Sequence, residues 1–394
     1  MIHASSADRF LVTARIWGAG WWLVFLGIAA LAIGGLSTRT IVVACIGVAS
    51  YLAGTVPMFG ATRAARARPG SGVCRQPTWT MLFVVLVVLF QFGMALQSIG
   101  SLFNLGARYR ESYYEGDVYG GSILFVLYES FIVPLGVFAV AHWLCSRHKI
   151  GLWRFAAASF FCLDALLKAG RFPLYFLFFF FAVSRLIGVT RIRVWVYVVV
   201  GCGLAFGALL LSLAREGLDI DSGWEVISNL LRIGVLNYHV VGFYIFQKIS
   251  NSATFVGTLG AGSYTFGFAS YFLALVGRRA GFDVTYAQQG LNIALTNEIY
   301  IPTLGTYNAF GTNMLPLYLD AGILGVAAGF YVLGWLVRGG LRRGSQVEAI
   351  DVVALFTMVF GIFQPLIMSA YFLLPLSIAC IRKLTHTQSP NAHF

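Results

Sequence analysis

Long apolar stretches recur along the chain, and most polar or charged residues fall in the segments between them. A helix that crosses a membrane needs about 20 apolar residues, at about 1.5 Å of rise per residue. The pattern therefore predicts an all-α polytopic membrane protein with about ten transmembrane helices. The predicted spans are 17–36, 41–60, 81–103, 122–144, 152–168, 172–190, 194–214, 314–337, 347–366 and 367–381.

One long segment, residues 215–313, separates the seventh and eighth predicted spans. It is too aromatic to be a solvated linker, and its apolar run at 266–276 is too short to cross a bilayer. Residues 224–246 carry apolar side chains at helical spacing, which predicts an amphipathic helix. We expect this external loop to form amphipathic and re-entrant helices, within one integral membrane domain over residues 1–394.

Composition narrows the class of protein further. The chain is 59% hydrophobic and only 11% charged, whereas a soluble domain carries roughly a quarter charged residues. The net charge of +12 would suggest a nucleic acid partner for a soluble protein. Here, however, most Lys and Arg residues fall on one side of the predicted spans. The positive-inside rule makes that side and both termini cytoplasmic, so no nucleic acid is expected as a partner.

The strongest chemical signal is a group of charged residues inside the predicted membrane region. Asp164, Lys168 and Arg171 stand at i, i+4 and i+7, so they share one helical face. Such residues cost about 2.5–3.5 kcal/mol each on insertion scales and usually face a cavity or a partner. A recessed turn follows, well placed to meet a lipid-linked phosphate, with Asp164 holding Lys168 in place. Alternatively the charges neutralise one another and lock two helices, and the buried acid Glu129 pairs with them.

The long loop holds a second candidate group. Arg232 and His239 lie seven residues apart and share a helical face, which pairs a phosphate ligand with a side chain that carries a proton near neutral pH. Arg278 follows the short apolar run and is a further candidate ligand for pyrophosphate. An interfacial helix explains the same residues without chemistry, because its arginines reach the lipid headgroups and its histidine is incidental.

Three short motifs carry a resemblance to a known family. They are the turn Lys168-Ala-Gly-Arg171 before an aromatic-rich span, the segment Tyr307-Asn308-Ala-Phe-Gly-Thr312, and the segment Leu317-Tyr318-Leu319-Asp320-Ala-Gly322. With the large external loop, they resemble the oligosaccharide repeat-unit polymerases (Wzy type) of bacterial O-antigen and capsule synthesis. The resemblance covers roughly residues 150–330. The chain departs from the family pattern at Gly311, which is inserted between the aromatic residue and the threonine.

The resemblance implies a GT-C-like glycosyltransferase in the bacterial inner membrane. It would move a glycan from undecaprenyl pyrophosphate onto a fresh lipid-linked repeat unit, on the periplasmic face. A flippase and a chain-length regulator in the same membrane are the partners it implies, with no cofactor and no metal. The charge that develops on the leaving pyrophosphate needs fixed cations. The available cations are Lys168, Arg171, Arg232 and Arg278.

The acceptor hydroxyl needs a general base, and His239 is the best candidate by its ordinary pKa. Glu298 and Asp320 are the next candidates for the base, and Asn308 is a further candidate for the site. Two rival functions remain open. An O-antigen ligase or another lipid-linked sugar transferase would share the placement of charges. A transporter of lipid-linked glycans or small solutes would need discontinuous helices in related halves of the chain.

Overall fold

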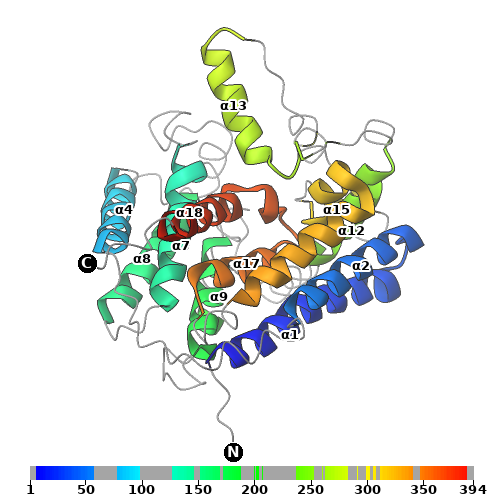
Figure 1. The fold of residues 1–394 in the computed structure, drawn as a ribbon, viewed down its shortest axis with the longest axis horizontal. Helices are drawn as coiled ribbons and strands as arrows, with labels where there is room; N and C mark the ends of the chain where they lie inside the picture. The colour runs from blue at the N-terminus through cyan, green and yellow to red at the C-terminus, as the bar shows by residue number, and fades with distance from the viewer. Residues whose placement is uncertain are drawn as a thin grey trace, which may run out of the picture. The chain divides into compact units, whose positions relative to one another are not determined.

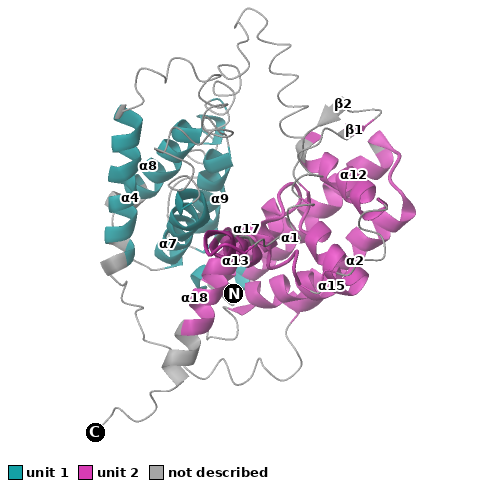
Figure 2. Ribbon diagram, turned by 90° about the horizontal axis from the view of Figure 1, so that it is seen from above, with its two compact units in different colours: residues 1–10, 69–231, 345–349 teal, residues 11–68, 232–344, 350–394 magenta. Residues whose placement is uncertain are grey.

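The computed structural model of the chain is shown in Figure 1. It divides into two compact units, coloured separately in Figure 2: unit 1 holds residues 1–10, 69–231 and 345–349, and unit 2 holds residues 11–68, 232–344 and 350–394. The residues that the structure describes are 6–56, 78–97, 127–145, 151–168, 172–187, 201–203, 237–252, 262–282, 299–301, 305–307, 311–339 and 347–387, with the single positions 199, 206, 260 and 291.

Unit 1 is built from helices that pack on one another in pairs. Its described elements are α4 (Thr78–Gln97), a π-helical turn (Tyr128–Ile132) that runs into α7 (Val133–Cys145), α8 (Gly151–Lys168) and α9 (Phe172–Leu186). Helix α8 packs against both α4 and α9. The contact between α8 and α9 includes the buried rings of Phe161 and Phe180, whose centroids lie 5.7 Å apart. Unit 1 therefore has an apolar core of its own.

The described part of unit 2 contains the remaining described helices and a short pair of strands. Its elements are most of α1 (Ser6–Gly27), a π-helical turn (Ile28–Ile33), α2 (Thr38–Thr55), α12 (Tyr238–Ser250), α13 (Gly267–Arg279), β1 (Ile299–Ile301), β2 (Gly305–Tyr307), α15 (Met314–Val337), most of α17 (Ala349–Phe360), a 3-10 turn (Leu366–Met368) and α18 (Ala370–Thr387). Strands β1 and β2 pair antiparallel, with Ile299 opposite Tyr307.

The closest helix contact in unit 2 joins α2 to α15, and glycines make it possible. A Cβ atom added at Gly54 would lie 2.3 Å from the carbonyl oxygen of Tyr331, and one added at Gly334 would lie 2.1 Å from that of Tyr51. Both distances are far below van der Waals contact. Small residues let the backbones of membrane helices approach this closely, so no larger residue fits at either position without a shift of the helices.

The two ends of α2 show how α15 runs beside it. At the C-terminal end, Arg15 of α1 donates from Nε to Thr55 Oγ1 (2.9 Å) and from Nη2 to the Thr55 carbonyl (2.7 Å), and Arg338 donates to the carbonyl of Val56. At the N-terminal end, Arg39 donates to the hydroxyl of Tyr318, near the start of α15. The two helices therefore run parallel. The two ends of α2, which has 18 residues, are about 27 Å apart.

Within the described residues, four helices are long and apolar enough to cross a membrane, as expected for an all-α membrane protein. They are Asp8–Leu31, Thr38–Thr55, Tyr128–Cys145 and Met314–Val337, each overlapping a predicted span. Shorter apolar helices fall in four further predicted spans, at Leu82–Leu96, Phe172–Leu186, Ala349–Phe360 and Ala370–Ile381. The predicted span 152–168 is helical as α8, and 194–214 lies mostly outside the described residues.

Helix α12 differs from the amphipathic surface helix predicted at 224–246. Residues 224–236 lie outside the described part of the chain, and from Val240 to Phe246 only Tyr244 has more than slight exposure. The sequence there is apolar almost all the way round, and a helix of that kind is buried. Helix α12 packs against α2 and α15, so this prediction is wrong for the described residues.

Helix α13 agrees with the prediction that residues 266–276 are too short to cross a membrane. It has 13 residues and ends in Arg278 and Arg279. Its side chains Leu273 and Val276 are 72% and 62% exposed. The helix therefore leaves much of its apolar surface uncovered within the described structure.

Candidate functional site

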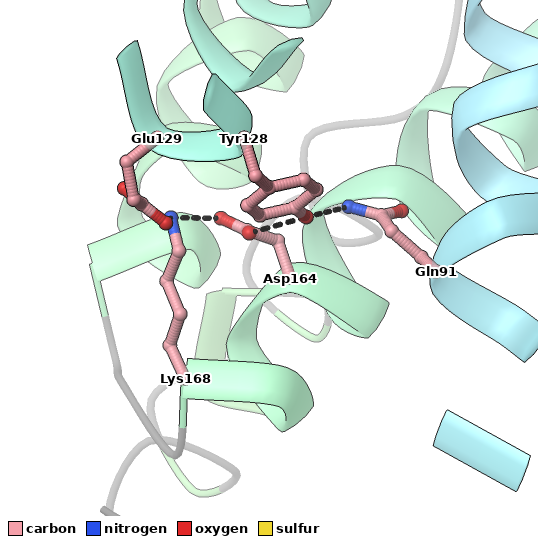
Figure 3. Close-up of polar contacts among 5 residues, drawn as sticks. All are labelled: Gln91, Tyr128, Glu129, Asp164 and Lys168. Carbon is pink, nitrogen blue, oxygen red and sulfur yellow. Dashed lines mark hydrogen bonds and ion pairs between the residues drawn. The ribbon is translucent and has the colours of Figure 1, made fainter. Parts of the chain in front are cut away.

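A buried ion cluster lies in unit 1, at the last turn of α8 (Figure 3). The ammonium of Lys168 lies 2.9 Å from Asp164 Oδ2 and 2.8 Å from Glu129 Oε1. The side chain of Asp164 is 2% exposed and that of Lys168 12% exposed. Two sequence predictions are thereby confirmed: Asp164 holds Lys168 one helical turn away, and Glu129 joins the same cluster.

A chain of hydrogen bonds extends this cluster to a third helix. Tyr128 donates from its hydroxyl to Asp164 Oδ1 at 2.9 Å, and Gln91 of α4 donates from Nε2 to the Tyr128 hydroxyl at 2.6 Å. In Figure 3 the side chains follow one another in the order Glu129, Lys168, Asp164, Tyr128 and Gln91. The π-helical turn supplies both Tyr128 and Glu129. The network therefore joins α4, α7 and α8.

The charge balance of the cluster bears on the role proposed for Lys168. Two carboxylates surround one ammonium, so the charge of Lys168 is already compensated among the described residues. A buried ion pair of this geometry locks helices together and has little positive charge to offer a phosphate. The geometry therefore favours the structural alternative for Lys168. Arg171 lies outside the described residues.

The predicted general base, His239, is enclosed by aromatic rings. It lies near the start of α12 and is 9% exposed. Its ring stacks on Phe25 at a centroid distance of 4.4 Å, and the rings of Trp21 and Phe363 lie edge-on at 5.2 and 4.9 Å. These contacts hold the imidazole in one orientation. A substrate hydroxyl would reach it only by entering this aromatic enclosure.

Asp320 has a structural partner on each of its carboxylate oxygens. Oδ1 accepts from the backbone N–H of Tyr264 at 3.0 Å, and Oδ2 accepts from that of Thr265 at 2.6 Å. The helix α15 is interrupted directly afterwards, where Gly322 has a φ of 60°. Burial raises the pKa of the Tyr264 phenol, and the negative charge of Asp320 raises that pKa further. Asp320 thus fixes a turn on α15, which leaves it a weak candidate for the base.

Asn313 is a buried polar residue that sequence reasoning missed. It is 0% exposed, and its Nδ2 donates to the carbonyl of Thr357 at 2.8 Å while its Oδ1 accepts from the N–H of Ile367 at 3.0 Å. Its own N–H donates to the carbonyl of Gly361. One side chain therefore ties the start of α15 to α17 and to the turn that follows it. The only sequence signal was its place beside Thr312 in the resemblance segment.

The outcome for the remaining candidates is mixed. Arg278 is exposed, in the last turn of α13. Four candidate residues lie outside the described part of the chain: Arg171, Arg232, Glu298 and Asn308. The described candidates fall into two separate groups, since Lys168 and Asp164 belong to unit 1 whereas the others belong to unit 2.

Comparison with known proteins does not add to these observations. No protein-family model, no curated protein and no solved structure matches the chain.

Proposed function

We propose that the protein is a membrane glycosyltransferase that polymerises undecaprenyl-pyrophosphate-linked oligosaccharide repeat units into surface polysaccharide. One observation carries the proposal: the segment with the family resemblance is a structural centre of unit 2. Asn313, next to the second motif, binds α17, Tyr318 contacts Arg39 of α2, and Asp320 fixes the turn at Tyr264. A segment that organises its surroundings in this way is a suitable frame for a site.

The proposed reaction transfers a glycan between two lipid carriers. The acceptor hydroxyl oxygen forms a bond to the anomeric carbon of the donor glycan, and the bond from that carbon to the pyrophosphate oxygen breaks. The pyrophosphate leaves on its carrier with the bonding electron pair, and the hydroxyl proton passes to a general base. Arginines stabilise the developing charge. We retain His239 as the base and Arg171, Arg232 and Arg278 as phosphate ligands.

The parallel course of α2 and α15 supports the expected topology. These helices are the second and eighth of the ten predicted spans, and with a cytoplasmic amino terminus both would run inward. The loop 215–313 would then lie on the periplasmic face of the bacterial inner membrane, where lipid-linked repeat units are polymerised. A reporter fused after residue 260 should read periplasmic, and one fused after residue 340 should read cytoplasmic. A cytoplasmic signal at residue 260 would end the proposal.

Deleting the gene and running the surface glycans of the host on a gel is the direct test of activity. Glycans capped with a single repeat unit would support polymerisation. Lipid core without any repeat unit would support the alternative, an O-antigen ligase or a related transferase. A normal ladder of long glycans would contradict both glycosyltransferase functions.

A transporter remains a second candidate because of one specific feature. Helix α15 is interrupted at Ala321 and Gly322, where the backbone leaves helical geometry. Discontinuous helices line the substrate sites of many transporters. If the protein transports small solutes, its deletion would leave glycan length unchanged and would stop the solute from crossing the membrane. If it transports lipid-linked glycans, its deletion would leave these lipids on the cytoplasmic side, where a label that does not cross the membrane cannot reach them.

A further inference from the structure

An arginine that the sequence analysis did not select is held in a fixed orientation at the N-terminal end of α2. Arg39 donates from Nη1 to Asn251 Oδ1 at 3.1 Å and from Nη2 to the hydroxyl of Tyr318. Its guanidinium carbon also lies 5.2 Å from the centre of the Tyr318 ring. The three residues come from α2, the end of α12 and the start of α15. Contacts from both neighbouring segments therefore orient one exposed cation.

The charge of Arg39 is not compensated within the described part of the chain. Its described interactions are the two hydrogen bonds and the ring contact, and no carboxylate of a described residue lies within ion-pair distance. A guanidinium has five N–H donors, so three of those of Arg39 have no partner among the described residues. This is the opposite of Lys168, whose single charge meets two carboxylates.

A second cation lies on α12, the helix whose C-cap residue Asn251 accepts the hydrogen bond from Arg39. Lys248 is exposed in the last turn of α12. It precedes Asn251, the Arg39 partner, by three residues, a spacing that puts two residues on the same side of a helix. Its neighbour Gln247 accepts from the N–H of Ser37 at 2.7 Å, so this turn of α12 lies against the segment that leads into α2. Lys248 therefore places a second positive charge on the last turn of α12, the helix whose end binds Arg39 through Asn251.

The position of Arg39 along α2 indicates which anion would meet it. Arg39 is 16 residues from Thr55, which corresponds to about 24 Å along the helix axis. The hydrocarbon core of a bilayer is about 30 Å thick. Arg15 and Arg338 bind the far end of α2, so Arg39 marks the opposite edge of this apolar helix, where we expect the lipid headgroups. In the expected topology this edge is periplasmic.

We infer that Arg39, oriented by Tyr318 and assisted by Lys248, binds the phosphate of a membrane lipid. Arginine suits this role because its planar donors match two phosphate oxygens, whereas a lysine offers only a point charge. The choice of a polyprenyl pyrophosphate as the lipid rests on the proposed function. Bulk phospholipid headgroups share the same phosphate chemistry, so the experiment uses both as probes.

The test measures lipid binding by the full chain in a maltoside detergent, which carries no phosphate. Undecaprenyl pyrophosphate and phosphatidylglycerol are titrated separately, and bound lipid is counted by native mass spectrometry. Losing charge-assisted hydrogen bonds should weaken binding of the true ligand about 10- to 100-fold in Arg39→Ala. Arg39→Lys should recover little of this loss. Arg185→Ala removes an exposed cation elsewhere, in α9, and should bind both lipids like the parent.

Tyr318 acts as a positioning residue, and a double-mutant cycle separates this role from a general loss of structure. Tyr318→Leu should weaken binding in the parent chain but add nothing in the Arg39→Ala background. Tyr318→Phe keeps the ring and loses the hydroxyl, so its lipid affinity should lie between that of the parent chain and that of Tyr318→Leu. Equal effects of Tyr318→Leu in both backgrounds would contradict the positioning role.

Each binding outcome decides the inference. Weaker binding of undecaprenyl pyrophosphate supports the site with the carrier as its ligand, and weaker binding of phosphatidylglycerol alone supports it with a headgroup as its ligand. Unchanged affinity for both lipids in Arg39→Ala overturns the inference. The glycan gel of the deletion strain tests the proposed function independently. A polymerase phenotype with normal Arg39→Ala binding would keep the function and remove this site.

Discussion

The ion cluster of unit 1 predicts how much folding stability is lost when Lys168 is replaced. Replacing Lys168 by Met removes the ammonium that lies 2.9 Å from Asp164 and 2.8 Å from Glu129. Two carboxylates would then face each other, and Asp164 is 2% exposed. Breaking a buried ion pair by removing one partner costs about 3–5 kcal/mol. We expect Lys168→Met to lower the stability of the folded chain by this amount.

Because the cluster has two carboxylates and one ammonium, removing the charge of Asp164 should destabilise the fold less than removing that of Lys168. Asp164→Asn alone should cost only about 1 kcal/mol, because Lys168 keeps its ion pair with Glu129. The same change should partly rescue Lys168→Met, because it leaves one carboxylate instead of two. That carboxylate belongs to Glu129, whose side chain is 28% exposed and can reach water. The double variant should therefore be more stable than Lys168→Met alone.

Thermal unfolding of the full chain in detergent measures these differences. Arg185→Met removes an exposed cation in the neighbouring helix α9 and should melt like the parent. A Lys168→Met variant that melts like Arg185→Met would refute the reasoning. The double variant also separates structure from chemistry. If it folds and still produces long glycans, Lys168 has a structural role, and if it folds without producing them, Lys168 takes part in the reaction.

Three further predictions concern unit 2. Gly54→Ala should lower the melting temperature, because its Cβ would lie 2.3 Å from a backbone oxygen, whereas Gly20→Ala meets nothing within 4 Å and should not. The raised pKa of Tyr264 stabilises the fold below about pH 10, and this contribution is lost as the pH rises through the folded pKa. Above about pH 10, the parent should therefore lose stability faster than Tyr264→Phe in melting experiments. His239→Phe keeps the aromatic packing, and if His239 is the base it should lower glycan polymerisation about 10²–10⁴-fold. A parent-length glycan ladder would exclude that role.

Local sequence signals predicted the helices and the ion cluster because both depend on short spacings. An apolar run of sufficient length has few alternatives to a helix in lipid. Asp164 and Lys168 are four residues apart on one helix, so their pairing follows from the helical repeat. Glu129 was placed with them because a buried acid needs a partner and few buried cations were available.

The enclosure of His239 and the bonds of Asp320 could not be predicted because they depend on distant segments. The rings around His239 come from Trp21, Phe25 and Phe363, which lie more than one hundred residues away. The backbone N–H groups that bind Asp320 lie about 55 residues before it. Hydropathy and spacing contain no information about such contacts. A charged residue therefore looks equally available in the sequence whether or not the fold neutralises it.

The arginines at the two ends of α2 show how the fold resolves this ambiguity. Arg15 and Arg338 donate to carbonyls at the C-terminal end, where the helix dipole is negative and favours cations. Arg39 lies at the N-terminal end, where the dipole favours an anion instead. Its donors are held by Asn251 and Tyr318, and neither carries a negative charge. The first two arginines are thus accounted for by the helix itself, whereas Arg39 is oriented by neutral partners and faces no carboxylate among the described residues.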